Sequence, residues 1–360
     1  MTLNASKQLK VVFITRKWPP AVGGMETYSV ELATELERRV ALQTVYLPGR
    51  EGGATPSKQA LLGFFFKAVA AIFGSKRVDI FHIGDMAMWP LAFMSNVLKP
   101  RSRSVISAHG TDVAFGIRPG LAPKVYNFYL KSGAVLLGRR TTVIANSTPT
   151  GGFCTNAGYR NVKVVPLGTF AKPEVSSAQV AKPQYVLYVG RLAVRKGLAW
   201  FTSQVLPLLP SDINVKVAGS AWDLSEMQAI EGNPRVEFLG PIYGDELAAL
   251  RLGAIAVIMP NITLSGRDFE GFGLTAIEAS AVGAVLVASA VDGIVDAVRE
   301  GETGFLIAEG DRQAWANKIV EIAEWSPAKR LKFVQKAQQA AREYYSWSRV
   351  AEDCVRIYRP

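Results

Sequence analysis

The segment 270–280, EGFGLTAIEAS, places two carboxylates on either side of a glycine-rich turn. Gly271 and Gly273 have no side chain, so backbone amides can approach a ligand closely where a helix begins. A carboxylate accepts paired hydrogen bonds from vicinal hydroxyls, which suits Glu270 and Glu278 to the hydroxyls of a sugar and a ribose. The simpler interpretation is a charge at a helix N-terminus followed by an exposed glutamate in mid-helix.

A second candidate is the stretch YVGRLAVRKG at 188–197, where Arg191 and Lys196 follow the end of an expected strand. Two cations on a loop that enters a helix could hold a diphosphate, since arginine offers a planar fork and lysine a point charge. Two solvated cations in a basic protein are the alternative.

Glycines and histidines mark two further positions. Gly23 and Gly24 precede an expected helix, whose free N–H groups attract anions. The pattern is not G-x-G-x-x-G and no acidic residue closes a second strand, which disfavours an NAD enzyme. His109 follows a strand in HGTD, which favours a functional role over a structural one. His82, inside VDIFHIG, has a weaker claim as a residue bordering the acceptor.

Short β-branched runs alternate with helical periodicity along the chain, which predicts buried parallel strands. The runs occupy 9–15, 42–47, 78–84, 104–110, 141–147 and 162–168, and then 185–190, 213–219, 235–240, 254–260, 284–289 and 304–310. A polar stretch separates the two series. The pattern predicts an α/β protein with two Rossmann-like domains that face each other, and ligands in such sheets bind at the carboxyl ends of the strands.

The expected domains are 1–170, a linker at 171–183, and 184–345, with helix 346–360 packing back on the first domain. Residues 1–170 contain 21 Lys and Arg against 8 Asp and Glu, a net charge of +13, whereas the remainder carries −2. Such asymmetry indicates that one domain meets an anionic partner, for which nucleic acid and an acidic membrane are both candidates.

Composition narrows the setting. The two cysteines, Cys154 and Cys354, lack metal-ligand spacing, which predicts neither a disulfide framework nor a zinc site and fits a reducing cytoplasm. The first residues show no apolar signal-peptide core. No apolar stretch is long enough to predict a membrane span.

Several motifs occur in a fixed order: GG before the first helix, HGTD, VGRL-x3-KG, and E-G-F-G-L-x3-E-A. Together with DGIVDAVREGETGFL at 292–306, they resemble the retaining glycosyltransferases of family 4, which have the GT-B fold of two Rossmann-like domains across a deep cleft. The resemblance extends from residue 9 to the C-terminus. Asp292 stands where that family has glycine, and Asp296 is a second variant.

The resemblance implies a role for each matched residue. Arg191 and Lys196 would hold the donor diphosphate with Gly24 and the helix start at Gly271, Phe272, Gly273 and Leu274, while Ile242 lies in a loop that would flank the base. Glu278 would bind the ribose and Glu270 the donor sugar. His109 would lie beside the sugar as a catalytic residue with Glu270, Arg191 and Lys196. Asp112 and His82 would border the acceptor.

Residues 58–77, KQALLGFFFKAVAAIFGSKR, combine an apolar run with Lys58, Lys67, Lys76 and Arg77. The segment is too short to span a bilayer but could lie in its interface. A core helix is the alternative. Three consecutive phenylalanines favour peripheral contact with an anionic membrane surface.

The sequence therefore predicts a cytoplasmic enzyme at the inner face of the membrane. It would transfer a hexose or deoxyhexose, with retention, from GDP- or UDP-sugar to a lipid-linked or growing polysaccharide, as in lipopolysaccharide, O-antigen or exopolysaccharide synthesis. No metal or cofactor is required, because the chain has no Asp-x-Asp pair. A GT-B nucleotide-sugar epimerase is the alternative. A basic nucleic-acid-binding module is a second, disfavoured because no recognition motif is present.

Overall fold

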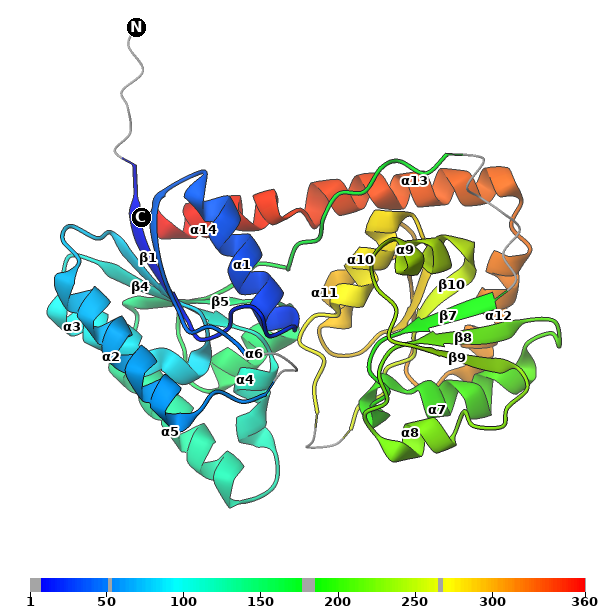
Figure 1. Cartoon of the computed structure of the whole chain (residues 1–360), viewed down its shortest axis with the longest axis horizontal. Helices are drawn as coiled ribbons and strands as arrows, with labels where there is room; N and C mark the ends of the chain where they lie inside the picture. The colour runs from blue at the N-terminus through cyan, green and yellow to red at the C-terminus, as the bar shows by residue number, and fades with distance from the viewer. Residues whose placement is uncertain (1–7, 51–53, 177–184, 265–267, 360) are drawn as a thin grey trace, which may run out of the picture. The chain divides into compact units, whose positions relative to one another are not determined.

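The structure is a computed structural model that describes residues 8–50, 54–176, 185–264 and 268–359 (Figure 1). The chain separates into two compact units. The first unit contains residues 1–167 together with 347–360, and the second contains residues 168–346. Each unit is built around its own parallel sheet of six strands.

The first sheet has the order β2-β1-β3-β4-β5-β6. Its strands are β1 (Lys10–Thr15), β2 (Ala41–Tyr46), β3 (Ile80–Ile83), β4 (Arg103–Ala108), β5 (Thr141–Ala145) and β6 (Val162–Val164). All six strands expected from the sequence are present and pair in parallel. The expectation that every strand is buried was wrong for β2 and β6, which lie at the edges and expose part of their residues.

Helices cover both faces of this sheet. They are α1 (Gly24–Glu37), α2 (Lys58–Gly74), α3 (Trp89–Leu98), α4 (Thr111–Ala114), α5 (Leu121–Leu137), α6 (Thr148–Asn156) and α14 (Trp347–Tyr358). Helices α2, α3 and α5 share one apolar core with Val12 and Ile14 of β1. Helix α14 packs beside α1 (Figure 1).

The second sheet has the order β12-β11-β10-β7-β8-β9. Its strands are β7 (Tyr185–Val189), β8 (Asn214–Ala218), β9 (Val236–Gly240), β10 (Ala254–Met259), β11 (Leu286–Ser289) and β12 (Phe305–Ile307). The surrounding helices are α7 (Leu198–Trp200), α8 (Leu224–Gln228), α9 (Gly244–Gly253), α10 (Leu274–Val282), α11 (Ile294–Ala297), α12 (Arg312–Ala323) and α13 (Pro327–Tyr344). These six strands also match the prediction, although no residue of the edge strand β9 is fully buried.

The described part of the expected linker, residues 171–176, packs against the second unit. Val175 is buried, and its backbone N–H donates to Oε1 of Gln338 on α13 at 2.9 Å. This segment therefore belongs to the second unit, and residues 177–184 lie outside the described residues. The helix expected at 346–360 corresponds to α14, which begins at Trp347 and is separate from α13, which ends at Tyr344.

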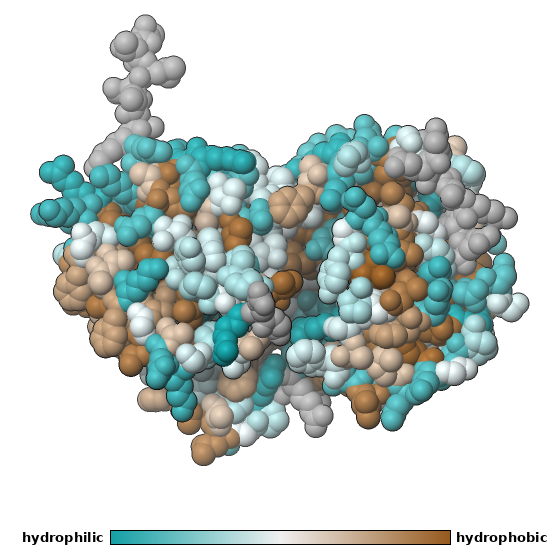
Figure 2. All heavy atoms as spheres, viewed as in Figure 1, coloured by the Kyte–Doolittle hydropathy of each residue, from teal (hydrophilic) through white to brown (hydrophobic). Residues whose placement is uncertain are grey.

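The segment 58–77 forms α2 and divides its apolar residues between two environments. Phe64, Ala68 and Ile72 are buried in the core. Phe65 and Phe66 remain exposed. Figure 2 shows apolar surface over the part of the first unit where Figure 1 places this helix. The side of α2 with Phe64, Ala68 and Ile72 fits a core helix, and the side with Phe65 and Phe66 fits a surface helix.

Candidate functional site

The loop that follows β7 is held against the loop that follows β10. The backbone N–H of Ile262 donates to the carbonyl of Arg195 at 3.0 Å. Gly197 has a φ of 69°, and a Cβ at this position would overlap the carbonyl oxygen of Pro260. Only glycine combines this backbone conformation with so close an approach. Lys196 is therefore fixed at the carboxyl edge of the second sheet.

Glu270 is the centre of a charged cluster at this edge. Its Oε2 lies 2.6 Å from Nζ of Lys196 and also accepts a hydrogen bond from Nη1 of Arg195. Arg195 in turn contacts Asp268 through Nε at 2.6 Å. The Glu270 side chain is only 14% exposed. Burial would raise its pKa, but Lys196 and Arg195 outweigh burial and lower the pKa to about 2. Glu270 is thus a permanent anion at neutral pH.

Asp292 and Gly293, which follow β11, hold the backbone of the glycine turn. The backbone N–H of Glu270 donates to Oδ2 of Asp292 at 3.0 Å, and Gly293 N–H donates to the Glu270 carbonyl at 3.0 Å. Asp292 adopts a positive φ of 49°, which aspartate tolerates better than most residues. The aspartate that replaces the family's glycine therefore has a structural role beside the site.

Helix α10 begins directly after this turn, without a side-chain cap. Gly273, at φ 95°, is the N-cap, and the first turn contains no acidic residue. The N–H groups of the first turn and the helix dipole suit an anion at this position. The Phe272 side chain is buried and contacts the ring of Tyr345, so only its backbone is available to a ligand.

Glu278 lies on α10, and its side chain is 43% exposed. Its Oε2 lies 2.6 Å from Nη2 of Arg251, a buried residue of α9. The guanidinium therefore fixes one carboxylate oxygen while the side chain remains accessible. The two glutamates of the opening motif thus differ, because Glu270 contacts two cations in a nearly closed environment and Glu278 contacts one in an open environment.

Arg191 is exposed, and its guanidinium lies 5.0 Å from the centre of the Trp222 ring. This cation–π contact orients Arg191 without using its N–H groups on a carboxylate. Ile242 is half-buried in the loop that leads to α9, beside the exposed Tyr243. The structure thus brings Lys196, Glu270 and the α10 start together, whereas no described contact joins Ile242 to them.

In the first unit, His109 and Asp112 form a compact turn after β4. The His109 N–H donates to Oδ1 of Asp112 at 2.8 Å, while Oδ2 accepts from Met86 N–H at 3.2 Å. Nε2 of His109 donates to the Gly84 carbonyl at 2.8 Å, which fixes the tautomer at this nitrogen. Asp112 accepts a backbone hydrogen bond with each oxygen and so orders this turn. Its contact with an acceptor stays a prediction.

His82 is fully buried in β3. Its Nδ1 lies 2.5 Å from the Tyr358 hydroxyl and its Nε2 lies 2.7 Å from the Ser107 hydroxyl. Burial lowers its pKa to about 3. The expected acceptor contact is therefore wrong for this residue, because both ring nitrogens are committed inside the core. Its function is to join β3 to β4 and α14.

Gly24 begins α1 and is exposed, as an anion site requires. However, Glu26 lies in the first turn of this helix and pairs with Lys17 at 3.4 Å. A carboxylate already uses the positive end of the helix, so this position favours an added anion less than the start of α10 does.

Three contributors to the second-unit site were missed at the sequence level: Arg195, Arg251 and Trp222. Arg195 is adjacent to Lys196 in sequence, but its partner Glu270 is 75 residues away. Sequence spacing alone does not identify such long-range pairs. The only available signal was the doubled cation in VRKG.

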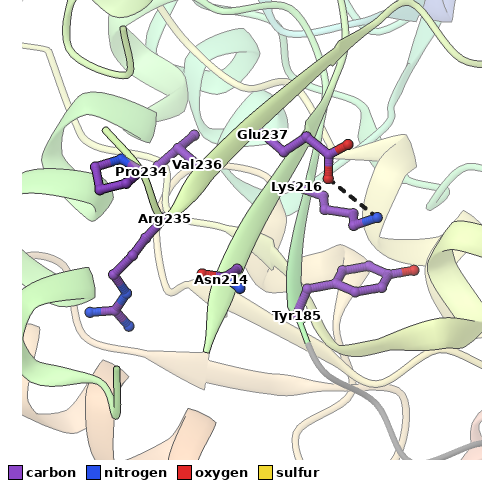
Figure 3. Close-up of a pocket in the computed structure, with 7 residues that line it drawn as sticks. All are labelled: Tyr185, Asn214, Lys216, Pro234, Arg235, Val236 and Glu237. Carbon is purple, nitrogen blue, oxygen red and sulfur yellow. Dashed lines mark ion pairs between the residues drawn. The ribbon is translucent and has the colours of Figure 1, made fainter. Parts of the chain in front are cut away.

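A hollow of about 310 Å³ lies at the opposite, amino-terminal ends of β7, β8 and β9 (Figure 3). Lys216 crosses it, pairs with Glu237 at 3.3 Å and lies 4.8 Å from the centre of the Tyr185 ring. These groups satisfy one another, and we assign no ligand to this hollow.

In the part of the chain that the structure describes, no three His, Cys, Asp or Glu side chains gather as a metal-binding group. No helix in the same residues has both the length and the apolar character needed to cross a bilayer.

Two protein families match the chain, one in each half. Residues 22–169 match "Glycosyltransferase Family 4" and residues 183–324 match "Glycosyl transferases group 1". The D-inositol 3-phosphate glycosyltransferase of Salinispora tropica is 35% identical over 161 residues, which is 42% of this chain and 32% of that protein. The phosphatidyl-myo-inositol mannosyltransferase of Mycobacterium leprae is 31% identical over 182 residues, 48% of this chain and 46% of that protein. The alignments therefore span less than half of these relatives.

Solved structures match over nearly the whole chain. The HepE protein of Anabaena, in complex with UDP, has a TM-score of 0.70 at 20% identity and covers 97% of this chain and 99% of its own. The sucrose-phosphate synthase of Thermosynechococcus elongatus has a TM-score of 0.72 at 21% identity, with 98% of each chain covered. At such identities the similarity concerns the fold, which is that of the GT-B glycosyltransferases. With both family matches, the chain belongs to the family 4 glycosyltransferases.

Proposed function

We propose that this protein transfers a hexose or deoxyhexose from a nucleoside diphosphate sugar to an acceptor hydroxyl. The observation that carries the proposal is the placement of Lys196 and Glu270 in contact, at the edge where α10 begins without a side-chain cap. A cation and free backbone N–H groups suit a diphosphate, and an ionised carboxylate suits sugar hydroxyls. Both kinds of group are needed to hold a nucleotide sugar.

In the proposed reaction, negative charge grows on the diphosphate as the bond to the sugar breaks. Lys196, Arg191 and the N–H groups of α10 would stabilise that charge. Glu270 accepts hydrogen bonds from the sugar and does not act as a general base, because a carboxylate with a pKa of about 2 holds a proton poorly at neutral pH. We propose retention at the anomeric carbon and a reaction that requires no metal.

Glu278 is the proposed ribose ligand. Arg251 fixes one of its oxygens at 2.6 Å, and the 43% exposure of the side chain leaves it accessible to a diol. Ile242, and Tyr243 beside it, are the proposed neighbours of the base. In the first unit, we assign His109 to the surroundings of the transferred sugar.

We propose a lipid-linked or growing saccharide as the acceptor, at the cytoplasmic face of the membrane, as in lipopolysaccharide, O-antigen or exopolysaccharide assembly. The net charge of +13 in residues 1–170 and the exposed phenylalanines of α2 support a membrane-associated acceptor. The names of the relatives also direct attention to inositol phosphates and phosphatidylinositol, which belong among the acceptors to be assayed.

A thermal-shift screen with UDP, GDP, ADP and their sugars tests the donor assignment. A ligand at a hundred times its Kd stabilises the native state by about 2.7 kcal/mol. One nucleotide series should raise the Tm of the protein, and Lys196→Ala should abolish the shift while the control Lys336→Ala, at an exposed residue of α13, retains it. The absence of a shift with every nucleotide would refute the proposal.

Product analysis distinguishes the alternatives. With the donor identified, an NMR assay should show transfer only when an acceptor is present, with the anomeric configuration unchanged. Conversion of a free UDP-sugar into its epimer would instead identify a GT-B epimerase. A salt-dependent gel shift with nucleic acid, without any nucleotide-sugar binding, would identify a basic binding module.

A further inference from the structure

Two helices of the first unit leave an apolar face uncovered. On α2, Leu62, Phe65, Phe66 and Phe73 are exposed although the opposite side of the helix is packed in the core. On α5, the exposed apolar residues are Leu121, Val125, Phe128, Val135 and Leu136. Figure 2 shows apolar side chains gathered over the part of the first unit where Figure 1 places these helices. Phe66 is 61% and Phe128 is 74% exposed.

The charge of this face has one sign. Neither helix contains an acidic residue. Lys58 and Lys67 on α2, and Lys124 and Lys131 on α5, are exposed beside the apolar residues. Four further cations, Lys76, Arg77, Arg139 and Arg140, are exposed just beyond the C-terminal ends of the two helices. Exposed aromatic and aliphatic residues flanked by cations fit an anionic lipid surface.

A pocket of about 280 Å³ lies where α2 packs against α3. Phe65 of α2 and Leu91 of α3 line it, and Tyr129 of α5 adds to its wall. Arg16, which follows β1, also lines the pocket and pairs with the buried Asp85 at 2.7 Å. The pocket is therefore largely apolar and has one cation in its wall.

We propose that α2 and α5 together dock this protein on an anionic bilayer, and that the pocket lined by α2, α3 and Tyr129 of α5 receives a hydrocarbon chain of a lipid in that bilayer. The proposal deepens the membrane association suggested above, because it adds α5 and a defined lipid-chain site to α2. The proposal rests on the proposed function in one respect, because a membrane-associated acceptor is the reason for the protein to approach a membrane. The tests below measure lipid binding and do not require turnover.

Vesicle flotation tests the docking face. The full chain should bind vesicles of phosphatidylcholine mixed with phosphatidylglycerol, and high salt should weaken the binding. The double variant Phe66→Ser with Phe128→Ser should bind at least about tenfold more weakly, because each change removes an exposed apolar anchor. The matched control is Leu224→Ser with Phe238→Ser, which alters exposed apolar residues of the second unit. Equal loss in the control, or no loss in the first variant, would overturn the proposal.

Charge reversal tests the electrostatic part separately. Lys124→Glu with Lys131→Glu should reduce binding to anionic vesicles by about tenfold or more. Binding of equal strength to pure phosphatidylcholine by the unmodified protein would contradict an anionic surface. Every variant should keep the nucleotide-induced rise in Tm, so a failure of docking is separable from a failure of the donor assignment.

Photocrosslinking tests the pocket. Phosphatidylglycerol with a diazirine in its acyl chain should label peptides of α2, α3 and α5 in the vesicle-bound protein. Leu61 lines the pocket and is partly exposed, so Leu61→Trp fills space there while keeping the face apolar. This variant should retain vesicle binding and lose most labelling on α3. Unchanged labelling of α3, or labelling confined to the second unit, would overturn the pocket assignment.

Discussion

Nζ of Lys196 and Oε2 of Glu270 lie 2.6 Å apart, although the two residues come from loops that follow different strands. Each is an ion-pair partner of the other. The cation assigned to the diphosphate and the anion assigned to the sugar therefore form one unit. A donor that binds both residues has to form its hydrogen bonds to Lys196 and Glu270 while they also contact each other.

Removal of the Lys196 ammonium should affect turnover more than folding. Lys196→Ala is expected to lower kcat/KM by about 10²- to 10³-fold, because the developing charge on the diphosphate loses a preorganised cation. Lys196→Arg should recover part of the activity. Steady-state kinetics with the identified donor provide the measurement, and near-unchanged kinetics for Lys196→Ala would contradict the assigned role.

We assign Arg195 a positioning role, because its guanidinium pairs with the carboxylates of Glu270 and Asp268. Arg195→Met should lower kcat by about tenfold through misplacement of Glu270. It should also move the lower limb of the pH–rate profile upward, since Glu270 loses a cation that lowers its pKa. Arg195→Lys should restore the profile in part, and an unaltered profile in Arg195→Met would argue against positioning.

Loss of the Glu278 carboxylate should weaken nucleotide binding with little effect on the chemical step. Glu278→Ala is expected to raise the Kd of the nucleoside diphosphate by about tenfold, as for one lost charged hydrogen bond. Isothermal titration calorimetry measures this change. Glu237→Ala, at another exposed and ion-paired glutamate, is the control and should leave the Kd unchanged.

Two glycines with nearly the same backbone conformation separate the effect of strain from that of space. Gly197 and Gly232 have φ values of 69° and 72°, but a Cβ at Gly232 meets nothing within 4 Å. Gly232→Ala should cost about 1 kcal/mol of unfolding free energy. Gly197→Ala should cost about 3 kcal/mol or more, because the methyl group also overlaps the Pro260 carbonyl. Urea denaturation should distinguish the two variants. Equal midpoints of unfolding would contradict the predicted overlap with the Pro260 carbonyl.

His82 should make the first unit sensitive to acid. Its pKa falls from 6.5 to about 3 on burial, so below pH 6.5 the unfolded state binds a proton that the folded state does not. The free energy of unfolding should therefore decline as the pH falls from about 6.5 towards 3. His82→Gln should flatten this decline in urea titrations at several pH values. Parallel pH profiles for the two proteins would contradict the assignment.

The strands of both sheets could be predicted from the sequence because each is a short β-branched run bounded by polar turns. All twelve strands were found, and the errors in their burial concern β2, β6 and β9, which lie at sheet edges. Strand order, and therefore edge position, depends on pairing between distant segments. A hydrophobic pattern within one strand does not identify which strands lie beside it.

Part of the site could be predicted from the sequence for a related reason. Lys196 and Glu270 were selected because each lies beside a glycine turn at the end of a strand, and the structure places them in contact. Arg251 was not selected, since nothing local distinguishes it from other helix arginines until α9 packs beside α10. His82 was overvalued because the sequence does not show that Tyr358 and Ser107 satisfy its ring. The apolar stripe of α5 was also overlooked in favour of α2.

The return of the chain at residue 347 limits how these units can be recombined. Val350, Cys354 and Tyr358 of α14 are fully buried within the first unit, and Tyr358 also holds His82. A fragment that ends at residue 167 would expose this part of its core. A chimera that exchanges donor specificity therefore needs two junctions, near residues 167 and 347, with the native C-terminal helix retained.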